Sequence, residues 1–311
     1  MNIYKKLKRY LRRKAAKYVW KRWFPWNYAH YSYWERTGKE LSWKHPNDIN
    51  QKLFWLHRYW QHPLIVQCAD KLGMRDYVKE CGLENLLTNV YAVYESEEQI
   101  EWGELPDRFV LKCNHGSGFN IICRDKSKLD IEKAKSNIHE WLHTFLGFDT
   151  AEYHYQYIRP QLYVEEYIGD KNNERLEIQF FCFNGEPRHI LVRNDLGDAA
   201  KRSFAISYNM NWERVPERKG EDSSITIPQP KELGQMIEYT KRLAKPFPHI
   251  RVDYYLVNHK VYIGELTFTT HGNILSNYTE ETLIKWGNEL QLPKKLKTKW
   301  SKQFTSFAKG E

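Results

Sequence analysis

A lysine followed by a short glycine loop is the stretch of this sequence best suited to chemistry. Lys112 ends the apolar run 109–111, and the loop after it carries Gly116, Ser117 and Gly118. A lysine at the end of a strand can place its ammonium on phosphate oxygens while the backbone N–H groups of the loop close over them. The pattern is neither G-x-x-x-x-G-K-[ST], because the lysine comes first, nor G-x-G-x-x-G. By itself such a loop is also typical of a plain β-turn.

A second group combines two carboxylates with a guanidinium. Arg251 and Asp253 are two residues apart, so they share one face of an expected strand. Glu265 lies on the following strand, across the Asn258-His259 turn. Carboxylates supply the oxygen ligands that Mg²⁺ prefers, and an arginine beside them can stabilise a moving phosphoryl group. The alternative is a cross-strand salt bridge on a solvated face, although the apolar neighbours indicate half-buried strands, where unpaired carboxylates are costly.

An acidic and apolar run lies between these two groups. It consists of Glu165, Glu166, Tyr167 and Ile168. An extended segment of this kind can present its backbone groups to an adenine, and Glu177 further along can accept the hydroxyls of a ribose. The alternative is an edge strand with solvent-facing acids. With Lys71 placed upstream, the pieces follow the order that an ATP-binding enzyme needs.

The composition bounds the class of protein. A chain of 311 residues can hold one large or two modest domains. Its five cysteines include no C-x-x-C pair, which indicates a reduced cytoplasmic protein rather than a disulfide framework or a zinc site. The net charge of +9 is concentrated in residues 1–22, which contain ten Lys or Arg and no acid. The remainder is close to neutral, so we expect no nucleic-acid partner, because no basic groove continues a phosphate track.

The N-terminal segment is basic and rich in aromatic residues. It lacks the run of about 20 apolar residues that spans a bilayer, and the apolar core and cleavage site of a signal peptide. Its apolar residues recur near helical spacing, and a basic amphipathic helix fits an anionic membrane surface. Residues 1–24 are therefore expected to lie on the inner face of the cell membrane. The alternative is a helix that docks against its own domain.

Hydrophobic periodicity predicts the elements that position these residues. We expect a helix after Pro46, with Asn47 as its N-cap. Further helices are expected over 63–82, 129–146 and 231–244, and over most of the basic tail 279–309. Strands are expected over 86–94, 108–113, 119–124, 161–168, 176–183, 187–193, 203–208, 250–257 and 260–267. The pattern predicts an α+β protein with largely antiparallel sheets, in two lobes that meet near residue 165.

Taken together, these residues resemble the ATP-grasp superfamily, and within it the TupA-like group linked to teichuronopeptide and capsule-type polysaccharide biosynthesis. The resemblance covers about residues 45–275. Its most specific pieces are Ala69-Asp70-Lys71, Arg75-Asp76-Tyr77-Val78, Leu111-Lys112 to Gly118, Glu165-Glu166-Tyr167-Ile168, Phe181-Cys182-Phe183-Asn184-Gly185 and Gly264-Glu265-Leu266-Thr267-Phe268. It implies an ATP-grasp fold of two α+β lobes that clamp ATP. The expected divisions are a helical segment over 1–60, lobes over 61–164 and 165–278, and a tail over 279–311.

The resemblance also implies roles for single residues. Lys71 and Lys112 would hold the phosphates of ATP, residues 116–118 would cap them, residues 165–168 would meet the adenine, and Glu177 would meet the ribose. Arg251 and Lys112 would support phosphoryl transfer. Asp253 and Glu265 would hold Mg²⁺.

Two departures from the family pattern bear on these roles. Thr267 stands where such enzymes usually have an asparagine, and Asn273 is the candidate to replace it as a metal ligand. Only about 70 residues, which look helical, precede Lys71. Many family members have a Rossmann-like domain there, so the acceptor site must be built differently.

The implied reaction activates a carboxylate as an acylphosphate, which an amine attacks to give an amide and ADP. The expected acceptor is the uronic-acid carboxylate of a cell-surface polysaccharide or its lipid-linked precursor, and the expected donor is an amino acid or amino alcohol. One alternative is a phosphotransferase that acts on a hydroxyl. Another is a membrane-associated assembly factor with a vestigial nucleotide site, which Thr267 favours. Lys201, Arg202 and His271 are candidates to contact the acceptor or the phosphates, with a surface or structural role as the alternative.

Overall fold

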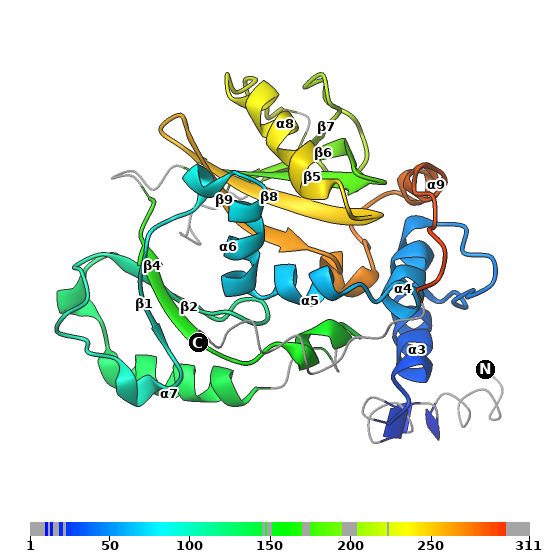
Figure 1. Ribbon diagram of the computed structural model, residues 1–311. Helices are drawn as coiled ribbons and strands as arrows, with labels where there is room; N and C mark the ends of the chain where they lie inside the picture. The colour runs from blue at the N-terminus through cyan, green and yellow to red at the C-terminus, as the bar shows by residue number, and fades with distance from the viewer. Residues whose placement is uncertain are drawn as a thin grey trace.

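The structure is a computed structural model that describes residues 23–144, 147, 151–169, 175–194, 204–222 and 224–296, and also 10, 11, 13, 14, 19 and 20. Two antiparallel sheets dominate it (Figure 1). The first has the order β1-β4-β2-β3, from β1 (Val90–Tyr94), β2 (Phe109–Cys113), β3 (Asn120–Cys123) and β4 (Leu162–Glu166). The second has the order β7-β6-β5-β8-β9, from β5 (Leu176–Phe183), β6 (Glu186–Asn194), β7 (Ala205–Tyr208), β8 (His249–Val257) and β9 (Lys260–Thr267). The predicted α+β class with antiparallel sheets is confirmed.

Helices surround the two sheets. They are α3 (Pro25–Thr37), α4 (Ile49–Tyr59), α5 (Pro63–Ala69), α6 (Lys71–Glu80), α7 (Ile131–His143), α8 (Leu233–Ala244) and α9 (Glu280–Glu289). Short 3₁₀ turns lie at η2 (Glu84–Leu86), η3 (Glu97–Gln99), η4 (Lys126–Lys128), η5 (Tyr153–Tyr157) and η6 (Thr270–Asn273). Prolines at the first turns of α3 and α5 suit positions where a backbone N–H has no partner within the helix.

Two helix predictions were wrong in detail. The N-cap of α4 is Asp48, whose side chain accepts a hydrogen bond from the backbone N–H of Gln51, and not Asn47. The helix predicted over 63–82 is two helices, because Asp70 adopts an extended conformation and caps the second one. The break is important for the site, because it places Lys71 at the first position of α6.

The C-terminal prediction holds only for its first part. Helix α9 ends at Glu289, and residues 291–296 form no helix. The rest of the predicted helical tail, residues 297–309, lies outside the described residues.

The protein has two hydrophobic cores, each formed by one sheet and the helices that pack against it. The larger core joins the second sheet to α4, α5, α6 and α8. Helix α8 packs on β6 and β8, where the Thr240 and Tyr254 hydroxyls are 3.1 Å apart. Helices α5 and α6 contact β9 and lie beneath the second sheet in Figure 1. The smaller core lies between the first sheet and α7. Lys112 therefore belongs to the strands of the smaller core, whereas Lys71 begins a helix of the larger one.

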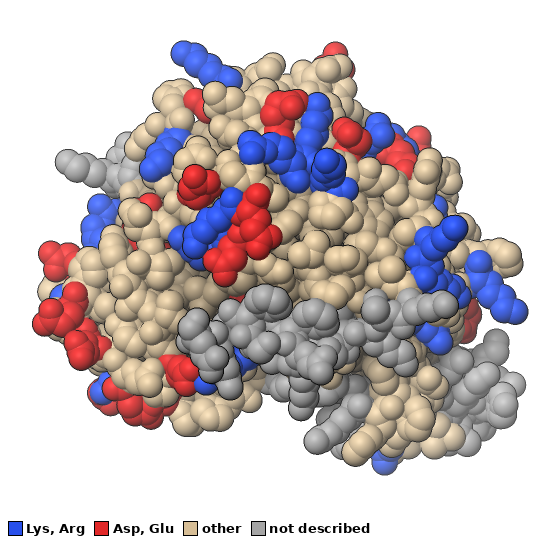
Figure 2. Space-filling model, viewed as in Figure 1, with Lys and Arg blue, Asp and Glu red and all other residues tan. Residues whose placement is uncertain are grey.

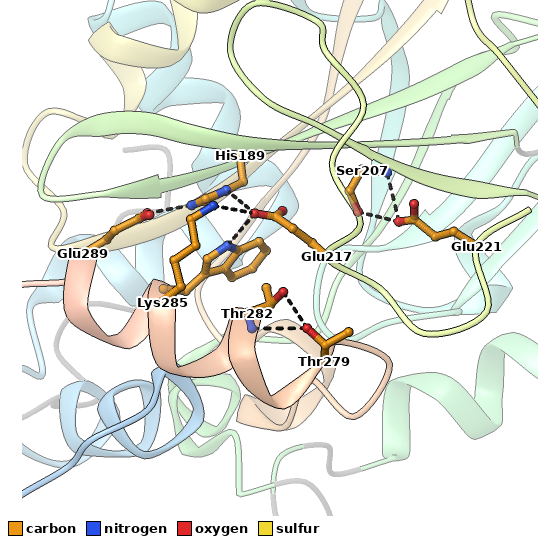
Figure 3. A network of polar contacts seen from close by, with 9 residues as sticks. His189, Ser207, Glu217, Glu221, Thr279, Thr282, Lys285 and Glu289 are labelled. Atoms are coloured by element: carbon orange, nitrogen blue, oxygen red, sulfur yellow. Dashed lines mark hydrogen bonds and ion pairs between the residues drawn. The ribbon is translucent and has the colours of Figure 1, made fainter. Parts of the chain in front are cut away.

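A buried polar network fastens α9 to the second sheet (Figure 3). The imidazole of His189 on β6 lies 3.0 Å from the carboxylate of Glu217 and 2.6 Å from that of Glu289. The indole N–H of Trp286 donates to Glu217 at 3.2 Å. The loop that begins at Glu217 is therefore held against both β6 and α9.

Charges of both signs are interspersed on the face shown in Figure 2, so this face offers no continuous basic track. None of the helices in the described part of the chain is long and apolar enough to cross a bilayer. The amphipathic helix predicted over residues 1–24 falls mostly outside the described residues. At the edge of that segment, Trp23 is 69% exposed and Phe24 is 52% exposed.

Candidate functional site

Lys71 connects the two cores. Its Nζ donates to the carbonyl of Gly116 at 2.6 Å, and its backbone N–H donates to the carbonyl of Asn114 at 2.9 Å. Burial lowers the pKa of Lys71, the carboxylate of Glu265 on β9 opposes that shift, and the ammonium of Lys112 adds to it. The structure thus gathers the two predicted lysines, the glycine loop and one predicted metal ligand.

Asn114 holds this junction together and was not singled out in the sequence. Its side chain is fully buried. The Nδ2 donates to Asp70 Oδ1 at 2.9 Å and to the carbonyl of Arg159 at 3.0 Å, and the Oδ1 accepts from the N–H of Gln161 at 2.8 Å. Burial raises the pKa of Asp70 to about 6, and the N–H of Leu72 and the amide of Asn114 oppose the rise. One amide therefore ties the end of β2 to the cap of α6 and to the chain entering β4.

The glycine loop connects β2 to β3. Gly116 has φ 72° and Gly118 has φ 80°, in the left-handed region that favours glycine. Ser117 and Gly118 are exposed at the tip, where a Cβ added to Gly118 would meet nothing within 4 Å. At the base of the loop, Phe119 stacks on Trp141 of α7 with ring centroids 5.6 Å apart. The loop is anchored at its base and open at its tip, as expected of a cap over a ligand.

Lys112 and Glu165 form an ion pair on one face of the first sheet. Glu165 is buried and also accepts from the hydroxyl of Thr88 at 2.6 Å. Arg75 donates to Thr88 Oγ1 at 3.2 Å, and its guanidinium lies 3.9 Å from Glu165. Sequence reasoning quoted Arg75 only as part of a motif and missed Thr88. These contacts hold the ammonium of Lys112 in place.

The predicted adenine segment divides into two parts. Glu165 and Glu166 lie in β4, between β1 and β2, so the edge-strand alternative was wrong. The backbone N–H of Glu166 donates to the carbonyl of Asn89 at 2.9 Å, and its carboxylate accepts from the Asn89 amide at 2.7 Å. Tyr167 and Ile168 follow the end of the strand and are half-buried. Tyr167 and Ile168 are therefore the two residues of the segment whose backbone groups do not belong to strand β4.

One face of the second sheet carries a row of polar side chains. In register, Gln179 of β5 faces Asp253 of β8, which faces Glu265 of β9. Paired residues on neighbouring strands point to the same side of a sheet. Gln179 Nε2 donates to Glu177 Oε1 at 2.6 Å and to Asp253 Oδ2 at 3.1 Å. Sequence reasoning missed Gln179, although its spacing of two from Glu177 is a signal that places both on one face. The opposite face packs against α8.

Arg251 forms a bidentate ion pair with the carboxylate of Asp253. Its Nε donates to Oδ1 at 2.7 Å, and its Nη2 donates to Oδ2 at 2.6 Å. Nη2 also donates to the hydroxyl of Thr267 at 3.1 Å, and this hydroxyl donates to Glu265 at 3.0 Å. Burial raises the pKa of Asp253 to about 7; Arg251 opposes the rise, and the carboxylates of Glu265 and Glu177 add to it. Burial acts to lower the pKa of Arg251, but Asp253 outweighs it and the pKa is raised.

These donors fit Mg²⁺. Buried carboxylates that raise one another's proton affinity are relieved by a divalent cation, and Mg²⁺ in nucleotide sites takes one or two carboxylates together with phosphate oxygens. Among the described residues, no group of three or more His, Cys, Asp or Glu is placed to hold a metal. Asp253 and Glu265 supply two carboxylates, a number that suits a Mg²⁺ ion whose other ligands come from phosphate oxygens. Thr267 contributes a hydroxyl beside them.

The loop after β9 contains two further predicted residues. Asn273 is fully buried, and its amide nitrogen and oxygen have no hydrogen-bond partner within the described part of the chain. His271, Gly272 and Asn273 all have φ between 51° and 64°, a run that costs strain at the two non-glycine positions. Burial, and then the guanidiniums of four arginines, lowers the pKa of His271 to about 4. Lys201 and Arg202 lie outside the described residues.

Known proteins resemble this chain at two levels. Residues 51–290 match the model of a family described as TupA-like ATPgrasp. No curated protein matches the sequence.

Similar solved structures include the D-alanine–D-alanine ligase from Bacillus anthracis complexed with ATP, at 15% identity and a TM-score of 0.39 over 65% of this chain and 54% of that one. Another is the L-amino acid ligase from Bacillus licheniformis, at 12% identity and 0.41 over 73% and 49%. A third is the biotin carboxylase domain of the 2-oxoglutarate carboxylase from Hydrogenobacter thermophilus, at 14% and 0.45 over 76% and 48%. The chain spans about half the length of each, and similarity at this level carries no argument about activity.

Proposed function

Because this chain belongs to the TupA-like ATP-grasp family, we propose that it is an ATP-dependent carboxylate–amine ligase. The family resemblance drawn from the sequence is correct, and the two antiparallel sheets are those of an ATP-grasp fold. ATP would lie between the sheets, with its phosphates at Lys71, Lys112 and the tip of the glycine loop. Its adenine would lie at residues 167–168 and its ribose at Glu177.

One observation carries the proposal: Lys71, on a helix that contacts β9 of the second sheet, is hydrogen-bonded to the glycine loop of the first. A cation at that point, with a second lysine and two carboxylates nearby, suits a triphosphate and its metal. If the ion pair between Lys112 and Glu165 served only stability, it would not need an open glycine loop beside it.

The chemistry follows from these charges. A substrate carboxylate attacks the γ-phosphorus of ATP, ADP leaves, and an acylphosphate forms; an amine then attacks the acyl carbon and phosphate leaves. Lys71, Lys112 and Arg251 would stabilise the charge of the moving phosphoryl group. Mg²⁺ held by Asp253 and Glu265, with Thr267 and Asn273 as further candidate oxygen ligands, would neutralise the phosphate oxygens. Closure of the two sheets would keep water from the acylphosphate.

The proposed substrates are an acidic sugar of a cell-surface polysaccharide, or of its lipid-linked precursor, and a small amine. The proposed location is the cytoplasmic face of the membrane, reached through residues 1–24. The exposed Trp23 and Phe24 support that contact, because aromatic side chains favour the membrane interface. The lobes proposed over 61–164 and 165–278, flanked by segments 1–60 and 279–311, remain the working divisions of the chain.

Calorimetry with Mg-ATP tests the nucleotide site. We expect binding by the intact protein that requires Mg²⁺ and is lost in Asp253→Asn combined with Glu265→Gln. A matched control neutralises two exposed acids, Glu140→Gln and Glu281→Gln, and should bind as the intact protein does. No binding by a folded intact protein would refute the ligase and favour an assembly factor.

The type of transfer is tested separately. Hydroxylamine traps an acylphosphate as a hydroxamate, so a ligase incubated with ATP and an acidic sugar should yield hydroxamate and ADP. A phosphorylated sugar without hydroxamate would instead identify a phosphotransferase. Thr267 bears instead on the assembly-factor alternative, because a hydroxyl is a weaker metal ligand than the amide expected there.

A further inference from the structure

A pocket with charged lining lies on the polar face of the second sheet. It has a volume of about 370 Å³, within the range of small ligand sites. Strands β6 and β7 form its floor, and the loops 218–222 and 271–277 form its walls. Its basic lining residues are Arg193, Arg218, Lys219 and His271.

The acidic residues of the pocket are already engaged. Glu221 accepts from the hydroxyl of Ser207 at 2.6 Å and from its N–H at 3.1 Å, as Figure 3 shows. Asp222 accepts from the hydroxyl of Ser224 at 2.6 Å. By contrast, the exposed guanidinium of Arg193 has no hydrogen-bond or ion-pair partner in the described part of the chain.

The other basic groups are held in place around the pocket. Arg218 lies over the ring of Tyr278 at 5.2 Å, and Lys219 donates to the carbonyl of Ser276 at 3.0 Å. Burial, and then the nearby arginines, lowers the pKa of His271 to about 4, so its ring lines the pocket as a neutral imidazole. Arg36 donates to the His271 carbonyl at 3.2 Å. Three cationic side chains, Arg193, Arg218 and Lys219, therefore line one opening, and Arg193 is the one whose guanidinium has no hydrogen-bond or ion-pair partner in the described part of the chain.

The pocket and the candidate nucleotide site share one face of the second sheet. Arg193 pairs in register with Glu177, which pairs with Tyr255 of β8. Strands in a sheet are about 4.8 Å apart and rise about 3.3 Å per residue, so the backbone of Arg193, level with Tyr255, lies roughly 16 Å from that of Arg251, four residues along β8. That spacing is on the order of three sugar rings. A ligand can therefore occupy this pocket and reach the reacting groups.

We propose that this pocket binds a second anionic group of the acceptor, a carboxylate or a phosphate, while the reacting carboxylate lies at Arg251. The inference rests on the proposed function, because it assigns the substrate side of the same site. Arg193 and Arg218 recognise the anion, since a guanidinium offers paired donors that match carboxylate and phosphate oxygens. His271 also lines the pocket. It follows that the acceptor carries at least two acidic groups, and a neutral sugar chain with one acid at its end is a poor substrate.

Calorimetry with defined probes tests this assignment. Trigalacturonate supplies carboxylates, glucose 1-phosphate supplies a phosphate, and maltotriose is the neutral match in length. We expect an anionic probe to bind and maltotriose not to bind. Arg193→Gln should weaken binding of that probe about tenfold or more, since a charge-assisted hydrogen bond contributes on that scale. Arg188→Gln removes an exposed arginine outside the pocket on the same strand and should leave the affinity unchanged.

The outcomes separate this inference from the proposed function. Mg-ATP affinity is measured on the same preparations, and its absence in the intact protein would refute the nucleotide site. Normal Mg-ATP binding with equal affinity for trigalacturonate and maltotriose would overturn the pocket, as would Arg193→Gln with the affinity of the intact protein. Arg218→Gln provides a second variant, whose melting temperature must match that of the intact protein because Arg218 also packs on Tyr278. Preference for glucose 1-phosphate over trigalacturonate would identify the anion as a phosphate.

Discussion

Replacing Asn114 with alanine should cost more stability than replacing any exposed asparagine of this chain. Three groups lose a partner: the carboxylate of Asp70, the carbonyl of Arg159 and the N–H of Gln161. Leaving a buried polar group unsatisfied costs about 1–3 kcal/mol. Asp70 keeps its bond from Leu72, and Arg159 is only partly buried. We therefore expect a loss of roughly 3 kcal/mol in the free energy of unfolding.

The deficit of Asn114→Ala should also depend on pH. The pKa of Asp70 is raised to about 6 by burial, and the amide of Asn114 is one of the groups that restrain it. Removing that amide raises the pKa further, so the variant carries a poorly solvated carboxylate at pH 8. When folding raises the pKa of an acid, the free energy of unfolding falls as the pH rises through that pKa. The deficit relative to the intact protein should thus be larger at pH 8 than at pH 5.

Urea denaturation at both pH values provides the measurement, with Asn288→Ala on α9 as the exposed control. Mg-ATP binding of the folded variant should also weaken, because Asn114 sets the position of Lys71 against the glycine loop. A deficit below about 1 kcal/mol, or one that grows as pH falls, would refute the role assigned to this amide.

Two further predictions concern other parts of the molecule. Burial acts to lower the pKa of His189, but Glu217 and Glu289 outweigh it and the pKa is raised; burial acts to raise the pKa of Glu217, but His189 outweighs it and the pKa is lowered. The pair of His189 and Glu217 should therefore stabilise the fold most between about pH 4.5 and 6.5. The variant His189→Asn should lose most of its free energy of unfolding, relative to the intact protein, in that window. A loss that peaks at pH 9 would contradict this prediction. The intact protein should sediment with anionic vesicles, and deleting residues 1–24 should abolish this sedimentation and leave Mg-ATP binding unchanged. Equal sedimentation of the two proteins would refute membrane binding through this segment.

Much of the second sheet could be predicted from the sequence, because alternation in a strand fixes which side chains share a face. Arg251 and Asp253 are two apart, and the turn that follows brings Glu265 beside them. The same rule places Gln179 on the same face of β5 as Glu177, two residues before it. Predictions of this kind succeed because they need only local geometry and one short turn.

The junction around Asn114 could not be predicted in this way. Apolar periodicity runs through α5 and α6, so the extended Asp70 between them leaves no break in the pattern. The partners of Asn114 lie 44 to 47 residues away. A buried amide that bonds distant backbone has no sequence signature, because asparagine in a loop is equally typical of a turn. The contacts of Arg75 and Thr88 with Glu165 were missed for the same reason.

The two lysines of the candidate site belong to different cores. Lys112 lies on the first sheet, and Lys71 begins a helix packed beneath the second. Among the described contacts, Lys71 and Asp70 bond to Asn114 and Gly116, and Arg75 of α6 lies 3.9 Å from Glu165 of the first sheet, so a small set of polar contacts bridges the cores. Any opening of the sheets would strain or break these bonds. A triphosphate that binds both ammonium groups would replace the bond from Lys71 to Gly116, so nucleotide binding and closure of the sheets should be a single coupled event.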